Sequence, residues 1–405
     1  MNILNKNDKN DKNDKNDKND NEYYFLNELK LIPGDIILER GLGIHSKLIM
    51  EKTKGSFSHA MIYVGGTLIE ATVQGGVYSR VPNRIVVPNG NYLRILRPKA
   101  GLDDESKNKL CTYARNMCGS AYSIREALIV TNDNKPQYSL TRGQFCSRLV
   151  AQAYASIGIN LSSNIDFCSP ADIEKSSILE EITGIIYKGT KAQADFAYEN
   201  STHKQHQKRA VKWVRKSKKI LSKEKIKTVF DQTSNKNRDI ATINDIFMAV
   251  YQNKANRTID EQIAAAMIST GYNLGPFDDI ERNPYRYSTP KFHSVYNDIP
   301  LHEREFNLNK EYTREKHELK HRPNNYLASY NNLKDNLNSP TFKVCFEIDL
   351  NMIKALNDRL KVLIEYCTCA SVKLPMTSDE MLMIKSLDRA IQCGDNLFSQ
   401  TPPFS

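Results

Sequence analysis

The sequence predicts an α+β domain that is followed by a mostly α-helical C-terminal region. Two apolar runs, 59–65 and 67–72, flank a Gly-Gly pair, a pattern typical of two strands joined by a tight turn. Residues 146–157 instead carry apolar side chains at helical spacing, and a glycine follows them as a helix stop. Because strand and helix signals are grouped within residues 23–190, an α+β domain is expected there.

Further segments extend the first part of this prediction. A Pro-Gly-Asp turn leads into an apolar run, alternating apolar and basic residues indicate a half-buried strand, and two other stretches favour helices. The expected elements are a strand within 31–38, a short helix at 45–50, a strand at 92–97 and a helix at 103–118.

The C-terminal part is predicted to be helical by the same criteria. Helices are expected at 243–251, 258–270 and 351–367. A capping box at Thr377–Glu380 opens a last helix, which Gly394 is expected to close. The stretch 275–338 has no clear period, so no helix is predicted for it.

Composition divides the chain into four parts. Residues 1–22 are predicted to be a disordered tail, because their repeated Asn-Asp-Lys tract has no apolar residue to bury. The domain at 23–190 follows, then a basic linker or strap at 191–240, then a mainly helical domain at 241–405. Within the linker, residues 204–230 contain eleven Lys or Arg and one Glu, so they carry the whole net charge of +10.

The cysteines and the apolar runs bear on the cellular compartment. The eight cysteines include no CxxC pair and no framework of a small secreted domain, which favours reduced thiols. No run approaches the ~20 apolar residues of a membrane-spanning helix, and the N-terminus has no apolar signal core. We expect a cytoplasmic protein, or one exported without a signal peptide, such as a secreted effector.

A histidine and a cysteine stand at the starts of two predicted elements. His59 begins the first hairpin strand, and Cys146 opens the helix at 146–157. A helix N-terminus and a nearby imidazolium both favour the thiolate, which is the nucleophilic form of cysteine. Glu70, in an Ile-Glu-Ala run, supplies a carboxylate that can hold the imidazole in the correct tautomer. These residues predict a Cys-His-Glu triad.

Four motifs occur in a characteristic order along the chain. They are the Pro-Gly-Asp turn at 33–35, Ser58-His59 before an apolar strand, Ile-Glu-Ala at 69–71, and Phe-Cys-Ser-Arg-Leu-Val-Ala-Gln-Ala-Tyr at 145–154. Together they resemble the circularly permuted NlpC/P60 papain-like cysteine hydrolases, and within these the YiiX/YebB-like branch. Ser-Pro-Ala-Asp at 169–172 also fits that branch.

The resemblance covers about residues 30–190 and implies a circularly permuted papain-like fold. In ordinary papain-like enzymes the cysteine precedes the histidine, whereas here His59 and Glu70 come first. The resemblance implies Cys146 as nucleophile, His59 as general base and acid, and Glu70 as the group that orients His59. It implies no cofactor.

Three functions remain open on these grounds. The first is a cysteine hydrolase that cleaves an amide or related acyl bond of a peptide, cell-wall peptide or N-acyl lipid through a thioester. The second is a thiol acyltransferase of the lecithin:retinol acyltransferase-like type, although Glu70 stands where those relatives are expected to have a second histidine. The third is a non-catalytic scaffold that binds a membrane or a partner.

Two other patterns are weaker. His317-Glu318-Leu319-Lys320-His321 matches HExxH, which on a helix can bind zinc. Charged residues crowd this segment, Pro323 is expected to end the helix, and Glu347 is the only tentative third ligand, so no metal site is predicted.

Residues 204–230 interleave apolar side chains with Lys and Arg. The segment is expected to be a linker or solvated helix face, with an anionic membrane surface as the next choice and no nucleic-acid partner.

Overall fold

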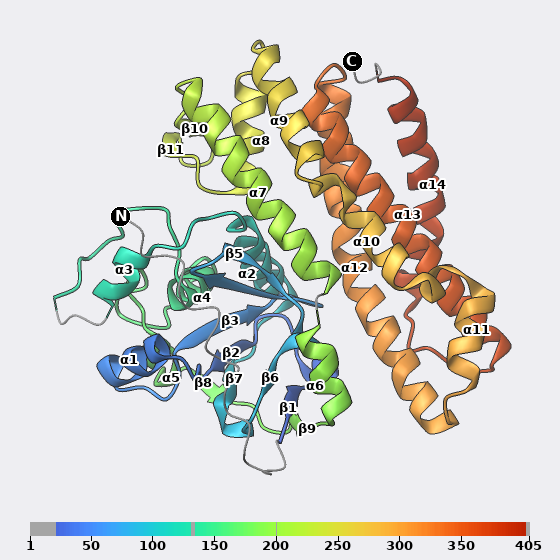
Figure 1. Ribbon diagram of the computed structural model, residues 1–405, viewed down its shortest axis with the longest axis horizontal. Helices are drawn as coiled ribbons and strands as arrows, with labels where there is room; N and C mark the ends of the chain where they lie inside the picture. The colour runs from blue at the N-terminus through green and yellow to red at the C-terminus, as the bar shows by residue number, and fades with distance from the viewer. Residues whose placement is uncertain (1–21, 131–133, 200, 402–405) are drawn as a thin grey trace.

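The chain folds into a sheet half and a helical half, which lie side by side in the computed structural model (Figure 1). The structure describes residues 22–130, 134–199 and 201–401, so the predicted N-terminal tail lies outside the described residues except for Glu22. Strands dominate the chain up to about residue 100, and long helices dominate its C-terminal half. The predicted mixture of α and β structure with a helical C-terminal region is confirmed.

The sheet half is built around a six-stranded antiparallel sheet with strand order β5-β4-β3-β2-β7-β8. Its strands are β2 (Ile36–Glu39), β3 (His59–Tyr63), β4 (Leu68–Thr72), β5 (Gly76–Arg80), β7 (Leu93–Pro98) and β8 (Leu179–Glu181). A small second sheet joins β6 (Val86–Val87), β1 (Tyr24–Leu26) and β9 (Ile186–Lys188) in that order.

The predicted hairpin at 59–72 is confirmed as β3 and β4. Gly65 and Gly66 in its turn have φ values of 87° and 72°, in the left-handed region that glycine adopts without steric penalty. Ile62 pairs with Ile69 directly beyond the turn. This register decides which side chains of the two strands share a face of the sheet.

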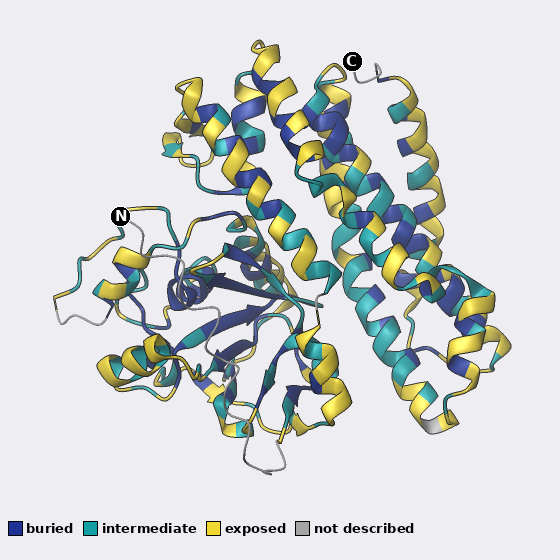
Figure 2. Cartoon of the chain, viewed as in Figure 1, coloured by how far each residue is buried: buried dark blue, intermediate teal, exposed yellow. Residues whose placement is uncertain are grey.

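The two faces of the large sheet have different partners. Ile62 and Ile69 belong to a core that includes residues of α2 (Asp104–Asn116) and α4 (Cys146–Ala155). Met61 on the other face packs with residues of the small sheet. The strands β2, β3 and β4 are largely buried, whereas α1 is largely exposed (Figure 2). The short helices of this half are α1 (Ile44–Thr53), α3 (Ile124–Ile129) and α5 (Pro170–Glu174).

The helical half contains every helix predicted for it and several more. The helices of this half are α7 (Thr202–Lys223), α8 (Ile243–Gln252), α9 (Arg257–Ser269), α10 (Gly275–Arg282), α11 (Thr289–Asn297), α12 (Leu301–Asp335), α13 (Pro340–Cys369) and α14 (Ser378–Ser399). A shared apolar core runs through α7, α8, α9, α12, α13 and α14.

Three predictions about this half are wrong. The stretch 275–338, for which no helix was expected, forms three helices. Pro323 does not end a helix, because α12 continues through it to Asp335; packing against α13 and α14 outweighs the cost of the missing backbone hydrogen bond. Gly394 does not close α14 either. A Cβ at Gly394 would lie 2.8 Å from side-chain atoms of Leu350 and Tyr326, so glycine permits close helix packing there.

The segment at 191–240, expected to be a basic linker or strap, forms α6 (Lys191–Tyr198), α7 and a hairpin of β10 (Thr228–Asp231) and β11 (Lys236–Asp239). Trp213 of α7 is completely buried and stacks on Tyr272, with ring centroids 4.6 Å apart. The helix passes between the two halves of the molecule (Figure 1). Its apolar stripe therefore packs into the helical core.

Two further features concern membrane-spanning helices and the cysteines. Within the described residues no helix combines the length and the apolar character that crossing a membrane requires. The eight cysteines are all free thiols.

Candidate active site

The β3–β4 hairpin brings His59 and Glu70 to one face of the sheet. Side chains alternate between the faces along a strand, and Ile62 pairs with Ile69. His59 lies three residues before Ile62, so it points to the opposite face. Glu70 directly follows Ile69 and points to that same opposite face. His59 Nε2 lies 2.8 Å from Glu70 Oε2, so the carboxylate fixes the ring and leaves Nδ1 for another partner.

Cys146 supplies that partner from the first residue of α4. Its thiol hydrogen-bonds to His59 and accepts hydrogen bonds from the backbone N–H groups of Ala60 and Ser147. The β3–β4 register covers Ile62–Tyr63 and Leu68–Ile69. Ala60 lies beyond these paired residues, so its N–H meets the thiol instead of β4. The structure therefore brings Cys146, His59 and Glu70 together.

The electrostatics of the three groups favour an ion pair. Burial disfavours every charged form here, but the hydrogen bond and the charge of His59 outweigh it and lower the pKa of the Cys146 thiol. Burial is likewise outweighed at His59, where bonds to Cys146 and Glu70 raise the imidazole pKa well above its ordinary value. Contacts with His59 and Arg80 lower the pKa of Glu70. These shifts all act toward a pair of thiolate and imidazolium beside a carboxylate.

The start of α4 also offers backbone donors. Phe145 precedes Cys146 in an extended conformation and provides no side-chain cap. The first N–H groups of a helix have no intrahelical partner and carry the positive end of the helix dipole. These groups favour the thiolate and can hydrogen-bond an oxyanion that forms on an attacked carbonyl.

A buried ion pair anchors this end of α4. Arg148 and Glu126 are 0% and 1% exposed, and Arg148 donates to Glu126 Oε2 at 2.9 Å. The guanidinium also donates to the backbone oxygen of Asp166 and lies over the rings of Phe145 and Phe167. Sequence reasoning missed this role. Arginine next to apolar residues in a predicted helix was the available signal, because a buried arginine needs a carboxylate partner.

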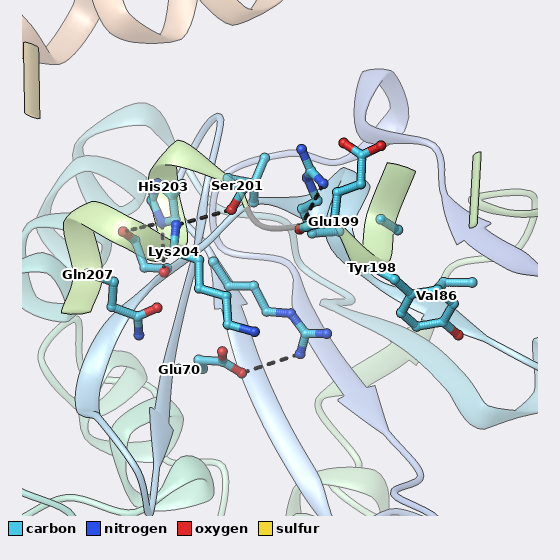
Figure 3. A pocket seen from close by; sticks show the side chains of 13 residues that line it. Glu70, Val86, Tyr198, Glu199, Ser201, His203, Lys204 and Gln207 are labelled. Atoms are coloured by element: carbon cyan, nitrogen blue, oxygen red, sulfur yellow. Dashed lines mark hydrogen bonds and ion pairs between the residues drawn. The ribbon is translucent and has the colours of Figure 1, made fainter. Parts of the chain in front are cut away.

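A cavity adjoins the triad on the side of Glu70. It has a volume of about 350 Å³, and its wall includes Glu70 and Arg80 of the sheet together with residues around the start of α7. Arg80 lies 3.6 Å from Glu70 Oε2, the same oxygen that contacts His59. Figure 3 shows Glu70 and Lys204 both projecting into this space.

The HExxH residues lie apart from the Cys146, His59 and Glu70 site. His317 and His321 of α12 contact the β3–β4 turn and Arg115 at the junction of the two halves. His317 Nε2 lies 3.4 Å from the Tyr63 hydroxyl, and Arg115 donates to His321 Nε2 at 2.8 Å. Glu318 pairs with Arg322 on the same helix.

The tentative third ligand, Glu347, belongs to α13. In the part of the chain that the structure describes, no three His, Cys, Asp or Glu side chains are grouped so as to hold a metal ion. No residue set is therefore assigned to a metal.

No protein-family model matches the chain, and no curated protein matches it. Among solved structures, the chain is similar to "metalloprotein yiiX from Escherichia coli O157:H7, DUF1105", with 18% sequence identity and a TM-score of 0.29. The alignment covers 37% of this chain and 95% of that one. So low a TM-score carries no argument about fold or activity, and the candidate site stands on its own geometry.

Proposed function

We propose that the chain is a cysteine hydrolase of the circularly permuted papain-like (NlpC/P60) type, YiiX/YebB-like branch, that cleaves an amide or related acyl bond. One observation carries this proposal. A thiol with a lowered pKa, an imidazole with a raised pKa and a carboxylate meet from α4, β3 and β4. An inert buried cysteine has its pKa raised instead, as Cys111 has, to about 11.

The geometry supports a two-step reaction. The Cys146 thiolate attacks the acyl carbon, forming a C–S bond, while backbone N–H groups of α4 stabilise the oxyanion. His59 gives its proton to the leaving amine, and the C–N bond breaks to leave a thioester. His59 then takes a proton from water, which attacks the thioester and releases the acid and the thiolate. Glu70 holds the imidazole in place throughout.

The motifs suggest a peptide, a cell-wall peptide or an N-acyl lipid as substrate. Arg148 and Glu126 contribute by fixing the start of α4, because they lock the helix to α3 and to the loop before Cys146. Their role is positional.

The first experiment measures alkylation of native protein by iodoacetamide from pH 5 to pH 9, with mass spectrometry of each cysteine. We expect Cys146 to react much faster than the other cysteines below pH 7, and His59→Ala to remove this advantage. Cys111 is the internal control, because burial raises its pKa to about 11. A Cys146 thiol that reacts no faster than Cys111 would overturn the proposal.

A second experiment addresses turnover. A panel of peptide amides, cell-wall peptides and N-acyl amides is incubated with wild type, Cys146→Ala and the matched control Cys111→Ala. We expect hydrolysis and a trapped acyl adduct at Cys146 in wild type and Cys111→Ala only. Turnover that survives in Cys146→Ala would contradict a covalent mechanism. Product formed only when an amine or lipid acceptor is added would identify an acyltransferase.

A further inference from the structure

The cavity beside Glu70 has features that the proposed reaction does not use. It lies between β5 with the segment that follows it and described residues at the end of α6 and the start of α7. Of the triad, Glu70 alone forms part of its wall. Figure 3 shows Tyr198 and Val86 toward one end and Gln207 and Lys204 toward the other. Tyr198 and Val86 therefore supply apolar surface at one end, and Gln207 and Lys204 supply polar groups at the other.

The acidic side chains that line this cavity, and one of its cations, have oppositely charged partners. Glu70 is hydrogen-bonded to His59, and Glu199 pairs with Arg282 at 2.9 Å, so both acidic groups have cationic partners. Arg80 lies between Glu39 and Glu70, at 3.3 Å and 3.6 Å. The three charges of that group are therefore engaged with one another or with His59.

Arg84 and Lys204 are the other two cations of this wall, and the Arg84 guanidinium is attracted to Glu199 only at longer range than an ion pair. Within the described residues neither forms an ion pair. Arg84 lies over the Phe196 ring at 3.8 Å and donates to the backbone oxygens of Phe196 and Glu199. Lys204 belongs to the first turn of α7 and is exposed toward the cavity. Two cations that line one open-sided cavity and form no ion pair among the described residues favour an anionic ligand.

We propose that this cavity binds a small phosphate monoester, with Arg84 and Lys204 as the cationic partners of the phosphate and Tyr198 and Val86 beside its organic part. A guanidinium offers several N–H donors to phosphate oxygens, and an ammonium adds a point charge. The Ser79 and Ser201 hydroxyl groups and the Gln207 amide line the same wall and supply uncharged polar contacts. The volume of about 350 Å³ suits a small ligand and excludes a folded partner.

Isothermal titration calorimetry on the full chain tests this proposal without any catalytic readout. The probes are glycerol 3-phosphate and inorganic phosphate, with chloride at equal ionic strength as the blank. We expect saturable binding to wild type, and a loss of at least about tenfold in affinity in Lys204→Ala and in Arg84→Ala. Lys208→Ala is the matched control, because Lys208 lies one turn further along α7, is exposed and does not line the cavity. It should bind as wild type does.

The experiment distinguishes a monoester ligand, free phosphate and the absence of a binding site. Tighter binding of glycerol 3-phosphate than of phosphate identifies the monoester as the ligand class, and equal binding identifies free phosphate at the same cations. No saturable heat from either probe, or affinity that falls equally in Lys204→Ala and Lys208→Ala, would overturn the site. Arg84 packs on Phe196, so Lys204→Glu provides a second variant if Arg84→Ala does not fold. The reactivity of Cys146 plays no part in this result.

Discussion

Two histidine sites in the molecule have opposite electrostatics. His59 has a carboxylate at 2.8 Å and a thiol as partners, and these raise its pKa well above the ordinary value. His317 and His321 are half-buried at the junction between the sheet half and the helical half. Burial, helped by nearby Lys320 and Arg115 respectively, lowers the pKa of each to about 4. Burial acts in the same direction at both sites, so the partner groups decide the outcome.

This difference separates the two sequence motifs chemically. The HExxH pair is neutral at pH 7, with one ring accepting from Arg115 and the other facing the Tyr63 hydroxyl. It holds α12 against the turn of the β3–β4 hairpin. His59 instead has a raised pKa, and its charge helps to lower the pKa of the neighbouring Cys146 thiol. The first arrangement suits a structural contact, and the second suits proton transfer.

The largest expected effect is a loss of stability in mild acid. The folded pKa values of His317 and His321 are about 4, below the ordinary 6.5. As the pH falls below 6.5 the unfolded chain therefore takes up protons first, and the free energy of unfolding decreases until about pH 4. The slope is about 1.4 kcal/mol per pH unit for each histidine. Urea unfolding at several pH values between 7 and 4.5 measures it.

The double variant His317→Gln, His321→Gln is the control for this slope. Glutamine can still accept from Arg115 but does not titrate. Carboxyl groups with a lowered pKa, such as Glu126 at about 2, lose their contribution progressively below about pH 5, to the same extent in both proteins. The difference between the slopes of wild type and the double variant therefore isolates the two histidines. A slope that is as steep in the double variant as in wild type would contradict the assignment.

The second prediction compares the two sites directly through Cys146. His59→Ala removes the cation that lowers the thiol pKa, so the alkylation rate at pH 6 should fall roughly 100-fold. His317→Ala alters a histidine that has no contact with the thiol, and the rate should stay within about twofold of wild type. Equal effects of the two substitutions would mean that general loss of structure, and not the ion pair, controls reactivity.

The third prediction concerns the turn that His317 contacts. Gly65 has φ 87°, and a Cβ added there would lie 3.0 Å from His317 Nδ1. We expect Gly65→Ala to lower the free energy of unfolding by about 2–3 kcal/mol, from backbone strain and from the crowded contact. Gly158→Ala is the matched control, because Gly158 has φ 81° and open space at its Cβ position. It should cost about 1 kcal/mol. Equal costs would show that the His317 contact contributes nothing.

Local signals in the sequence located much of the fold and the three residues of the candidate site. The Gly-Gly turn, the strand alternation and the helix that begins at Cys146 depend on residues close in the chain. The triad residues came from that local order together with the motif resemblance. The structure brings them together, and their catalytic role stays a prediction.

What the sequence did not indicate depends on contacts between distant segments. Pro323 lies within a helix because α13 and α14 pack alongside it. The buried Arg148–Glu126 pair joins residues 22 positions apart. The cavity between β5 and α7 exists only once the two halves have come together. No local pattern carries such information.

The smallest expected effect is at Glu318, the central acid of HExxH. In a metal site this residue would act as a general base, whereas here it pairs with Arg322 one turn away. The Glu318 and Arg322 side chains are each about 30% exposed, and pairs of this kind contribute about 0.5 kcal/mol or less. Glu318→Gln should therefore change the free energy of unfolding no more than Glu261→Gln, which breaks the exposed i,i+4 pair with Arg257. It should leave Cys146 alkylation unchanged. A Glu318→Gln variant that loses zinc affinity or enzymatic turnover, while Glu261→Gln does not, would give the second histidine site a chemical role.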